Sequence, residues 1–383
     1  MATGGGFPRI LLERSALERR RYFRDYTIAH PHLAEVYQRL HDELATVEQG
    51  SLIFVCGPSG IGKTTLLRRI EQKFIKEMKP ELGQDPCRLP LVMIEALSPE
   101  TGNFNWKDFY RRLLVKLDEP CIDKKIIPSQ QRNERQDYRH ITVLRKAGVA
   151  ELRHAVEQAL KYRRPAAVCI DEAQHLARMA SGRKLQDQLD CIKSLANVTG
   201  VPIVLCGHYE LLVFRNLSAQ LSRRSIDIHF RRYRADEKSE LRIFKNVVWS
   251  FGRHLPLEEE PDLVEQWDYL YERSLGCVGV LKPWLLKGLS AALKDGGRKL
   301  TLQHLNKTAL SVSRCKKMLL DLREGENLLA EPPEARHHLR LQLGLEKAPK
   351  RSSVEAEETK VITPKPKRLP GQRLPTRDPV GTG

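Results

Sequence analysis

A glycine-rich segment directly after a short apolar run constrains this chain more than any other feature. Residues 57–64 read Gly-Pro-Ser-Gly-Ile-Gly-Lys-Thr, and the apolar run Leu-Ile-Phe-Val-Cys occupies residues 52–56. An amphipathic pattern follows over residues 64–74. This is the G-x-x-x-x-G-K-[ST] motif in the order of strand, loop and helix that phosphate binding requires. The sequence therefore predicts a P-loop within an α/β fold.

The P-loop predicts roles for its own residues. Its glycines let backbone N–H groups approach phosphate oxygens, and the following helix directs its positive dipole end at the same anion. We expect the Lys63 ammonium to reach the β- and γ-phosphates of ATP and the Thr64 hydroxyl to bind Mg²⁺. A glycine-rich turn with an exposed lysine is the alternative, which the flanking pattern disfavours. The expected nucleotide-binding residues are Gly57, Pro58, Ser59, Gly60, Ile61, Gly62, Lys63, Thr64 and Thr65.

The charge balance indicates an anionic partner beyond the nucleotide. Lys plus Arg outnumber Asp plus Glu by 65 to 48, which gives a net charge of +17. Nucleic acid is the leading candidate for this polyanion, ahead of an anionic membrane. No stretch approaches 18 apolar residues and the N-terminus lacks the apolar core of a signal peptide, so we expect a cytoplasmic protein without a membrane partner. The eight cysteines form no C-x-x-C pair, and we expect no structural zinc.

Short apolar runs alternate with amphipathic helical patterns through the first two thirds of the chain, which favours a parallel sheet with helices on both faces. Only helical patterns remain from about residue 258 to residue 343. We expect strands at residues 52–56, 91–95, 166–171, 203–206 and 226–230, and lid helices at 263–275, 280–294 and 302–312. The expected divisions are an N-terminal arm and helix (1–50), an α/β ATPase core (51–255), a helical lid (256–344) and a disordered basic tail (345–383).

The tail has two interpretations. It is rich in proline, lysine and arginine and contains no aromatic residue. Such a segment buries too little apolar surface to offset the entropy of ordering it, which predicts a solvated, disordered end. The basic cluster at residues 365–368 equally fits a docking segment for a partner or for nucleic acid.

A second motif predicts the other half of the nucleotide site. The apolar run at residues 166–170 ends in Asp171 and Glu172, the pattern of a Walker B strand. A buried strand places both carboxylates at its carboxyl edge, beside the P-loop. We expect Asp171 to hold Mg²⁺ and Glu172 to polarise the attacking water. Two acids that cap the next helix are the alternative, which the upstream P-loop disfavours.

A pair of arginines, Arg223 and Arg224, precedes the expected fifth strand. An arginine there can reach the γ-phosphate bound to a neighbouring subunit, where it would speed hydrolysis by several powers of ten. An ordinary solvated basic pair fits the local sequence equally well. If one of the two is such an arginine finger, supplied by a neighbouring subunit, the rate of ATP hydrolysis depends on protein concentration.

Together these residues resemble the AAA+ ATPases and, among them, the TniB/TnsC-type transposition regulators, over roughly residues 20–320. The resemblance also includes His30-Pro31 and the blocks at residues 169–176, 220–224 and 276–282. It implies a parallel five-stranded sheet of order 5-1-4-3-2, followed by a small helical lid. The nucleotide would lie between the core and lid of one subunit and the arginine edge of the next.

The resemblance places three further residues at the nucleotide. His30 belongs to the segment before the first helix. His208 stands at the sensor 1 position, where such proteins often have Thr, Ser or Asn, and it either donates to a phosphate or the lytic water or is a simple strand-end residue. Lys282 stands where a sensor 2 arginine is common, and it offers a point charge instead of a fork. These departures put the hydrolysis rate in question more than nucleotide binding.

The resemblance implies a bacterial ATPase that assembles as a ring or filament on duplex DNA. A TniQ-like target-selection protein, with or without a CRISPR effector, and a TnsB/TniA-like transposase would then read the assembly. Residues 123–146 are the expected DNA-facing segment, and a solvated charged insertion is the alternative. The expected phosphate contacts, which would be independent of base sequence, are Lys124, Lys125, Arg132, Arg135 and Arg139.

Two other functions share part of this pattern. An AAA+ helicase loader or replication initiator would have nearly all of the same residues, but no winged-helix module is evident after the lid. A small-molecule P-loop kinase would have the P-loop. The paired acids, the arginine pair, the basic excess and the lid all count against a kinase.

Overall fold

The computed structural model describes residues 5–46, 48–98, 104–125, 147–177, 183–214, 225–330 and 333–346. The chain divides into two compact units, residues 1–330 and 331–383. In the second unit the described part contains one helix, α14 (Pro333–Gln342). Among the described residues, no helix is both long enough and apolar enough to cross a membrane.

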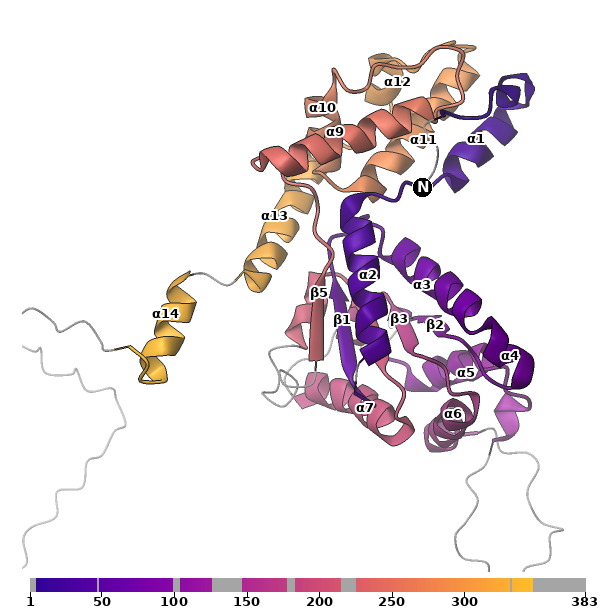
Figure 1. The fold of residues 1–383 in the computed structure, drawn as a ribbon, viewed down its shortest axis with the longest axis vertical. Helices are drawn as coiled ribbons and strands as arrows, with labels where there is room; N and C mark the ends of the chain where they lie inside the picture. Colours follow the sequence, from indigo (N-terminus) through magenta and orange to yellow (C-terminus); the bar gives the residue numbers. More distant parts are fainter. Residues whose placement is uncertain are drawn as a thin grey trace, which may run out of the picture. The chain divides into compact units, whose positions relative to one another are not determined.

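The first unit contains a parallel five-stranded sheet (Figure 1). Its strands are β1 (Leu52–Cys56), β2 (Val92–Glu95), β3 (Val168–Asp171), β4 (Ile203–Gly207) and β5 (Ser225–His229). The spatial order is β2-β3-β4-β1-β5, which confirms the expected order of 5-1-4-3-2. All strand pairs are parallel, so all strands end at the same edge.

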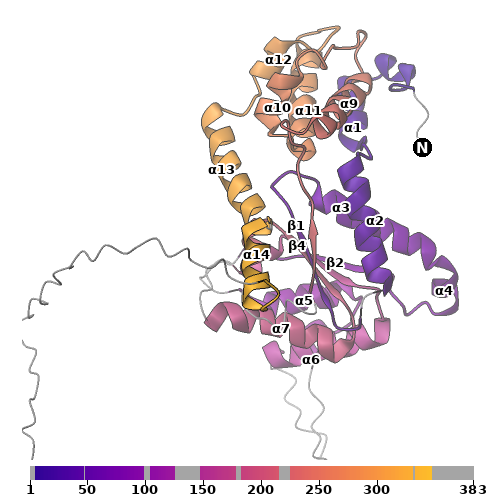
Figure 2. The same cartoon turned by 60° about the vertical axis from the view of Figure 1, so that its left-hand side comes forward.

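The helices of this unit fall into two sets, one that flanks the sheet and one that forms the helical region after it (Figures 1 and 2). The first set is α2 (Pro31–Thr46), α3 (Lys63–Glu77), α4 (Lys79–Gln84), α5 (Trp106–Lys116), α6 (Val149–Arg163) and α7 (Arg183–Thr199). The second set is α9 (Lys238–Arg253), α10 (Trp267–Ser274), α11 (Val278–Lys294) and α12 (Leu302–Asn306), with α1 (Ala16–Asp25) packed beside it. The last helix of the unit, α13 (Val312–Leu329), buries Cys315 and Leu322 in the core on one face of the sheet.

Alternate residues of β1, β3 and β4 enter two different apolar cores, because successive side chains of a strand point to opposite faces. In β1, Leu52 and Phe54 pack in the core formed with α5, α6 and α7. Ile53 and Val55 pack in the other core, with α2 and α3. The sheet is therefore covered on both faces, and its strand ends are the place left for polar side chains.

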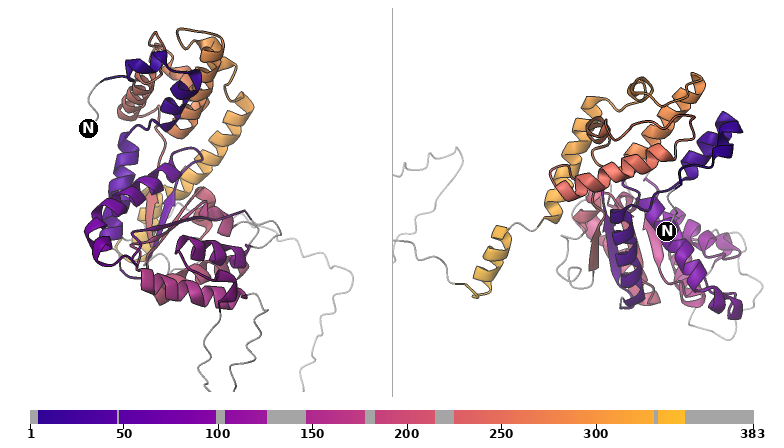
Figure 3. Two further views of the ribbon diagram at one scale, coloured as in Figure 1. Left: turned by 90° about the vertical axis from the view of Figure 1, so that its right-hand side faces the viewer. Right: turned by 45° about the horizontal axis from the view of Figure 1, so that its top comes forward.

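The helical region has its own apolar core, and that core begins before residue 256. Phe244 and Phe251 of α9 are buried with Leu281 and Leu285 of α11. Phe23 of α1 is fully buried in the same cluster. Figure 3 shows α1 beside the lid helices in both of its views. The N-terminal helix is therefore part of the packing of the helical region.

One lid helix differs from its expected extent. The apolar pattern over residues 302–312 predicts a single helix, but α12 ends at Asn306. A new helix, α13, begins at Val312, because the Ser311 side chain accepts a hydrogen bond from the Arg314 N–H and caps its first turn. Serine is a favoured N-cap residue, and this cap stabilises the start of α13.

Candidate functional site

The loop between β1 and α3 lies against the ends of two neighbouring strands. The Gly57 N–H donates to the Gly207 carbonyl at 3.2 Å. A side chain at Gly57 would come within 2.4 Å of the Phe230 carbonyl oxygen, so this position must be glycine. Gly60 and Gly62 have φ values of +70° and +117°, in a region that favours glycine. The three glycines are thus required by the loop's shape.

Lys63 begins α3 and is buried under the loop. Its ammonium donates to the carbonyl oxygens of Gly57 at 3.0 Å and of Pro58 at 2.9 Å. Burial lowers the pKa of Lys63, while nearby anionic groups, Glu172 and Asp171 among them, counteract that shift. The ammonium is therefore folded back into the loop, in the place where a phosphate bound to the loop would meet it.

Thr64 and Asp171 come together from separate segments. The Thr64 hydroxyl donates to the Asp171 carboxylate at 2.7 Å. Asp171 ends β3 and is buried, and its second oxygen accepts the Glu172 N–H at 3.0 Å. A hydroxyl and a carboxylate are oxygen ligands that suit Mg²⁺, which commonly takes one or two protein ligands together with phosphates and water. The pair therefore fits the expected magnesium site.

No group of three or more His, Cys, Asp or Glu residues in the described ranges is arranged to hold a metal on its own. A magnesium ion at Thr64 and Asp171 would therefore need ligands from the nucleotide and water. The expected absence of structural zinc stays a prediction.

Glu172 follows Asp171 in an unusual backbone conformation. Its φ is +52°, in the left-handed region that costs a non-glycine residue about 1–3 kcal/mol and that clusters at functional sites. Its carboxylate accepts a hydrogen bond from the Gln174 side-chain amide at 2.5 Å. The His208 ring lies 3.9 Å from the same carboxylate oxygen. The structure therefore brings the expected catalytic residue and the expected sensor 1 residue side by side.

His30 lies behind the P-loop and is almost fully buried. It is buried, its Nδ1 lies 2.9 Å from the Tyr233 hydroxyl, and its ring stacks on Phe230 with centroids 6.2 Å apart. Phe230 in turn approaches Gly57 and Gly62. Burial, with smaller effects from His32 and Arg69, lowers the pKa of His30 to about 3, so the ring is neutral at neutral pH. Its contact with nucleotide stays a prediction.

Lys282 lies on the lid helix that meets the P-loop, but its ammonium has another partner. It donates to the Arg24 carbonyl at 2.6 Å. The residues of α11 nearest to the P-loop are Gly279 and Val280, which approach Gly60 so closely that neither glycine has room for a side chain. The nucleotide contact of Lys282 stays a prediction.

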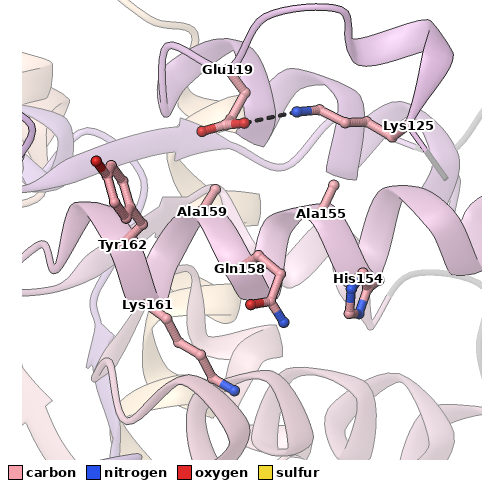
Figure 4. A pocket seen from close by; sticks show the side chains of 8 residues that line it. All are labelled: Glu119, Lys125, His154, Ala155, Gln158, Ala159, Lys161 and Tyr162. Atoms are coloured by element: carbon pink, nitrogen blue, oxygen red, sulfur yellow. Dashed lines mark hydrogen bonds and ion pairs between the residues drawn. The ribbon is translucent and has the colours of Figure 1, made fainter. Parts of the chain in front are cut away.

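Of the expected DNA contacts, only Lys124 and Lys125 lie in the described residues. The Lys125 ammonium forms an ion pair with Glu119 at 2.8 Å, and both line an open pocket of about 560 Å³ against α6 (Figure 4). This pairing reduces the charge that Lys125 offers to a phosphate. The pocket shares no residue with the P-loop or with the ends of β3 and β4. The other expected contacts, Arg132, Arg135 and Arg139, and the candidate fingers Arg223 and Arg224 lie outside the described residues, as does the tail from residue 347.

The site includes two residues for which the sequence indicates no role. Phe230, just after β5, forms part of the wall behind the P-loop. Gln174 connects Glu172 to the end of β4. The signal for Gln174 is its place two residues after the paired acids, in the block Asp-Glu-Ala-Gln-His.

A comparison with known families identifies part of the chain. A model described as the AAA domain matches residues 46–213. No curated protein sequence matches the chain significantly. With the strand order 2-3-4-1-5 and the flanking helices, the match shows the α/β fold of the AAA+ P-loop NTPases.

Solved structures similar to this chain include three archaeal proteins. The ORC1 protein of Aeropyrum pernix, solved in complex with DNA, is 16% identical, has a TM-score of 0.49, and aligns over 80% of this chain and 70% of that chain. The ORC2 protein of the same organism is 15% identical, has a TM-score of 0.46, and aligns over 77% and 71%. A Walker-type ATPase of Pyrococcus abyssi is 17% identical, has a TM-score of 0.41, and aligns over 81% and 76%. Values this low assign no activity to the present chain.

Proposed function

We propose that this chain is a magnesium-dependent ATPase whose nucleotide state controls its assembly on duplex DNA. One observation carries the ATPase part. The P-loop residues Lys63 and Thr64 lie at the same sheet edge as the two acids that follow β3, and the Thr64 hydroxyl is hydrogen-bonded to Asp171 at 2.7 Å. A cation, a hydroxyl and two carboxylates at the end of parallel strands are the groups that phosphoryl transfer from ATP to water requires.

Each residue has a definite task in this proposal. Lys63 exchanges its two carbonyl acceptors for phosphate oxygens, which carry more negative charge and accept stronger hydrogen bonds. Thr64 and Asp171 hold Mg²⁺, which neutralises phosphate charge when bound. Glu172 takes a proton from the attacking water. The water oxygen then bonds to the γ-phosphorus while the bond to the leaving ADP oxygen breaks, and ADP leaves with the electron pair.

The second part of the proposal is a role in transposition. The chain would assemble on duplex DNA as a ring or filament, receive a target from a TniQ-like protein, and recruit a TnsB/TniA-like transposase. The net charge of +17 supports a polyanionic partner, and the resemblance of the motif blocks to TniB/TnsC regulators supports this class of assembly. Arg223 or Arg224 of one subunit would complete the site of its neighbour.

Hydrolysis is tested with Glu172→Gln, which keeps the size of the side chain and removes the base. We expect unchanged affinity for ATP and a fall in turnover of about 100-fold or more. Glu265→Gln, at an exposed acid of the lid region, is the matched control and should hydrolyse ATP normally. Full turnover by Glu172→Gln would remove Glu172 from the catalytic role.

Assembly is tested by electron microscopy of the protein with duplex DNA and a slowly hydrolysed ATP analogue. We expect rings or filaments that disappear when ATP replaces the analogue and is consumed. Particles that remain monomeric with both ligands would contradict the assembly proposal. A stable complex with a replicative helicase and none with a transposase would favour the loader alternative. Transfer of phosphate to a metabolite would favour the kinase.

A further inference from the structure

Gln174 occupies a closed position between the ends of two strands. It lies in the short 3-10 helix η4 (Ala173–Leu176) and is only 4% exposed. Its side-chain amide donates to the Glu172 carboxylate at 2.5 Å and its side-chain oxygen accepts the His208 N–H at 3.1 Å. Both ends of the amide therefore have partners, which directly follow two different strands, β3 and β4.

Chemistry fixes the orientation of this amide. The His208 backbone N–H can only donate, so the side-chain oxygen of Gln174 must face it. The NH₂ group is then left facing a carboxylate, which can only accept. The reversed amide would place two donors together at His208 and two acceptors together at Glu172. The bridge from Glu172 through Gln174 to the end of β4 therefore has one hydrogen-bonding arrangement.

The end of β4 is shaped to admit this bridge. A side chain at Gly207 would come within 2.4 Å of the Gln174 side-chain oxygen and 3.2 Å of its backbone nitrogen. The φ of Gly207 is not in the left-handed region, so conformation does not require a glycine there. The space that the Gln174 side chain occupies does require a glycine at this position. This close approach indicates that the backbone at the end of β4 is shaped to hold the Gln174 side chain.

Glu172 needs such support. Its side chain is about one third exposed and belongs to a residue with a left-handed backbone, so packing alone does not fix it. A general base must hold its carboxylate within hydrogen-bonding reach of the water that it activates. The Gln174 side-chain amide donates to that carboxylate, and it ties the carboxylate to the end of β4.

We propose that Gln174 is a positioning residue for the Glu172 carboxylate in ATP hydrolysis, and that it couples this carboxylate to the end of β4 at His208. The inference rests on the proposed ATPase function. It predicts that loss of the bridge slows the chemical step and leaves nucleotide binding intact, because the phosphate contacts of Lys63 and Thr64 are made elsewhere.

The first test is Gln174→Met, which keeps the length of the side chain and removes both hydrogen bonds. The single-turnover rate of ATP hydrolysis should fall by about 10- to 100-fold. This is only part of the rate enhancement that the general base itself supplies. The affinity for a fluorescent ATP analogue should change by less than about threefold, since a factor of ten would require about 1.4 kcal/mol of lost binding.

Gln188→Met is the matched control. The Gln188 side-chain oxygen also accepts a partly buried hydrogen bond, from the Trp106 indole N–H at 2.7 Å. Gln188 makes no contact with Glu172 in this hydrogen bond. The control should keep normal hydrolysis.

A double-mutant cycle separates positioning from a general structural role. If Gln174 acts through Glu172, then Gln174→Met in the Glu172→Gln background causes no further loss of rate. Multiplicative losses in the double variant would overturn the proposal. Gly207→Ala attacks the same bridge from β4 and should give the same kinetic defect with the Gln174 side chain intact. It also keeps the test valid if Gln174→Met fails to fold.

The outcomes distinguish a failure of the proposed ATPase function from a failure of the inference about Gln174. A wild-type protein without ATPase activity, or a fully active Glu172→Gln, would refute the proposed function and the inference together. An inactive Glu172→Gln combined with fully active Gln174→Met and Gly207→Ala would refute the inference alone.

Discussion

The nucleotide edge of the sheet and the helical region after it are held by different kinds of contact. At the sheet edge, polar groups at the ends of β1, β3 and β4 are joined by hydrogen bonds, such as the one from Thr64 to Asp171. In the helical region, α1 contributes Phe23 to a core made by residues more than 200 positions later in the chain. Short polar motifs specify the first region, and long-range apolar packing specifies the second.

This contrast separates chemistry from stability. Changes at the sheet edge should alter nucleotide binding and turnover with small effects on folding, because the groups there are polar and several face solvent. Changes in the core of the helical region should lower the free energy of unfolding with small effects on the affinity of the folded protein.

The largest effect is expected from Phe23→Ala. Phe23 is fully buried and packs edge to face on Phe251 with centroids 6.0 Å apart. Removing a buried aromatic ring costs about 3–5 kcal/mol. Urea denaturation should show this loss, while the folded fraction keeps its affinity for ATP. Leu17→Ala, at an exposed position of the same helix, should change the free energy of unfolding by less than about 0.5 kcal/mol. An equal effect of both variants would mean that α1 is not part of the core.

Lys63→Ala should have the opposite effect, a large loss of nucleotide affinity with little change in stability. The ammonium is the cation of the P-loop, and its charge-assisted hydrogen bonds to phosphate should be worth on the order of 100-fold in nucleotide affinity. Calorimetric titration with ATP and Mg²⁺ measures this loss. The melting temperature without nucleotide should fall little, because burial already penalises the charge of Lys63. A variant that binds ATP normally would contradict the assigned role of the loop.

The sheet edge was largely predictable from the sequence, for a physical reason. A P-loop needs a strand before it and a helix after it, so the motif at residues 57–64 fixes its own surroundings. The five strands begin and end within two residues of the expected positions. Asp171 and Glu172 were predictable because an apolar strand that ends in acids must place them at the strand end. Gln174 was not, because its role depends on the approach of Gly207 from a strand 33 residues away.

The helical region was predictable only in outline. Periodicity indicates a helix at residues 280–294, but it does not say that Phe23 packs against that helix. The helix expected at residues 302–312 ends already at Asn306, and the next helix begins at Val312 after a local serine cap. Packing partners that are far apart in sequence leave no local motif, so they appear only in the structure.

The third prediction concerns His30, which links the N-terminal segment to the wall behind the P-loop. The pKa of His30 is lowered from 6.5 to about 3 by burial. In the unfolded chain the ring gains a proton below about pH 6.5, whereas the folded protein keeps it neutral. Its contribution to stability is therefore fully present above pH 6.5 and is lost as the pH falls towards 3. Between pH 7.5 and 5 the loss is about 2 kcal/mol.

Urea denaturation at the two pH values measures this dependence. In His30→Asn the difference in the free energy of unfolding between pH 7.5 and 5 should be smaller than in the wild type by about 2 kcal/mol. Identical pH dependence in the two proteins would mean that His30 is accessible to protons in the folded state.

The smallest effect is expected where the two regions meet. The first turn of α11 reaches the tip of the P-loop, and a side chain at Gly279 would come within 2.2 Å of the Gly60 carbonyl oxygen. Overpacking costs about 1–3 kcal/mol in a rigid core. Gly60 is exposed and its loop tip can shift, so Gly279→Ala should cost only about 1 kcal/mol of stability, at the lower end of that range.

The same substitution should weaken ATP binding by about fivefold, because the P-loop must move to accept the methyl group and 1 kcal/mol corresponds to roughly this factor. Gly83→Ala is the matched control: no atom lies within 4 Å of the added carbon there, and it should leave ATP affinity unchanged. A Gly279→Ala protein that loses stability but binds ATP normally would show that the lid contact serves packing alone. Loss of affinity with unchanged stability would place α11 within the nucleotide site itself. The expected joint effect is what makes this contact the point where the polar edge and the apolar region depend on each other.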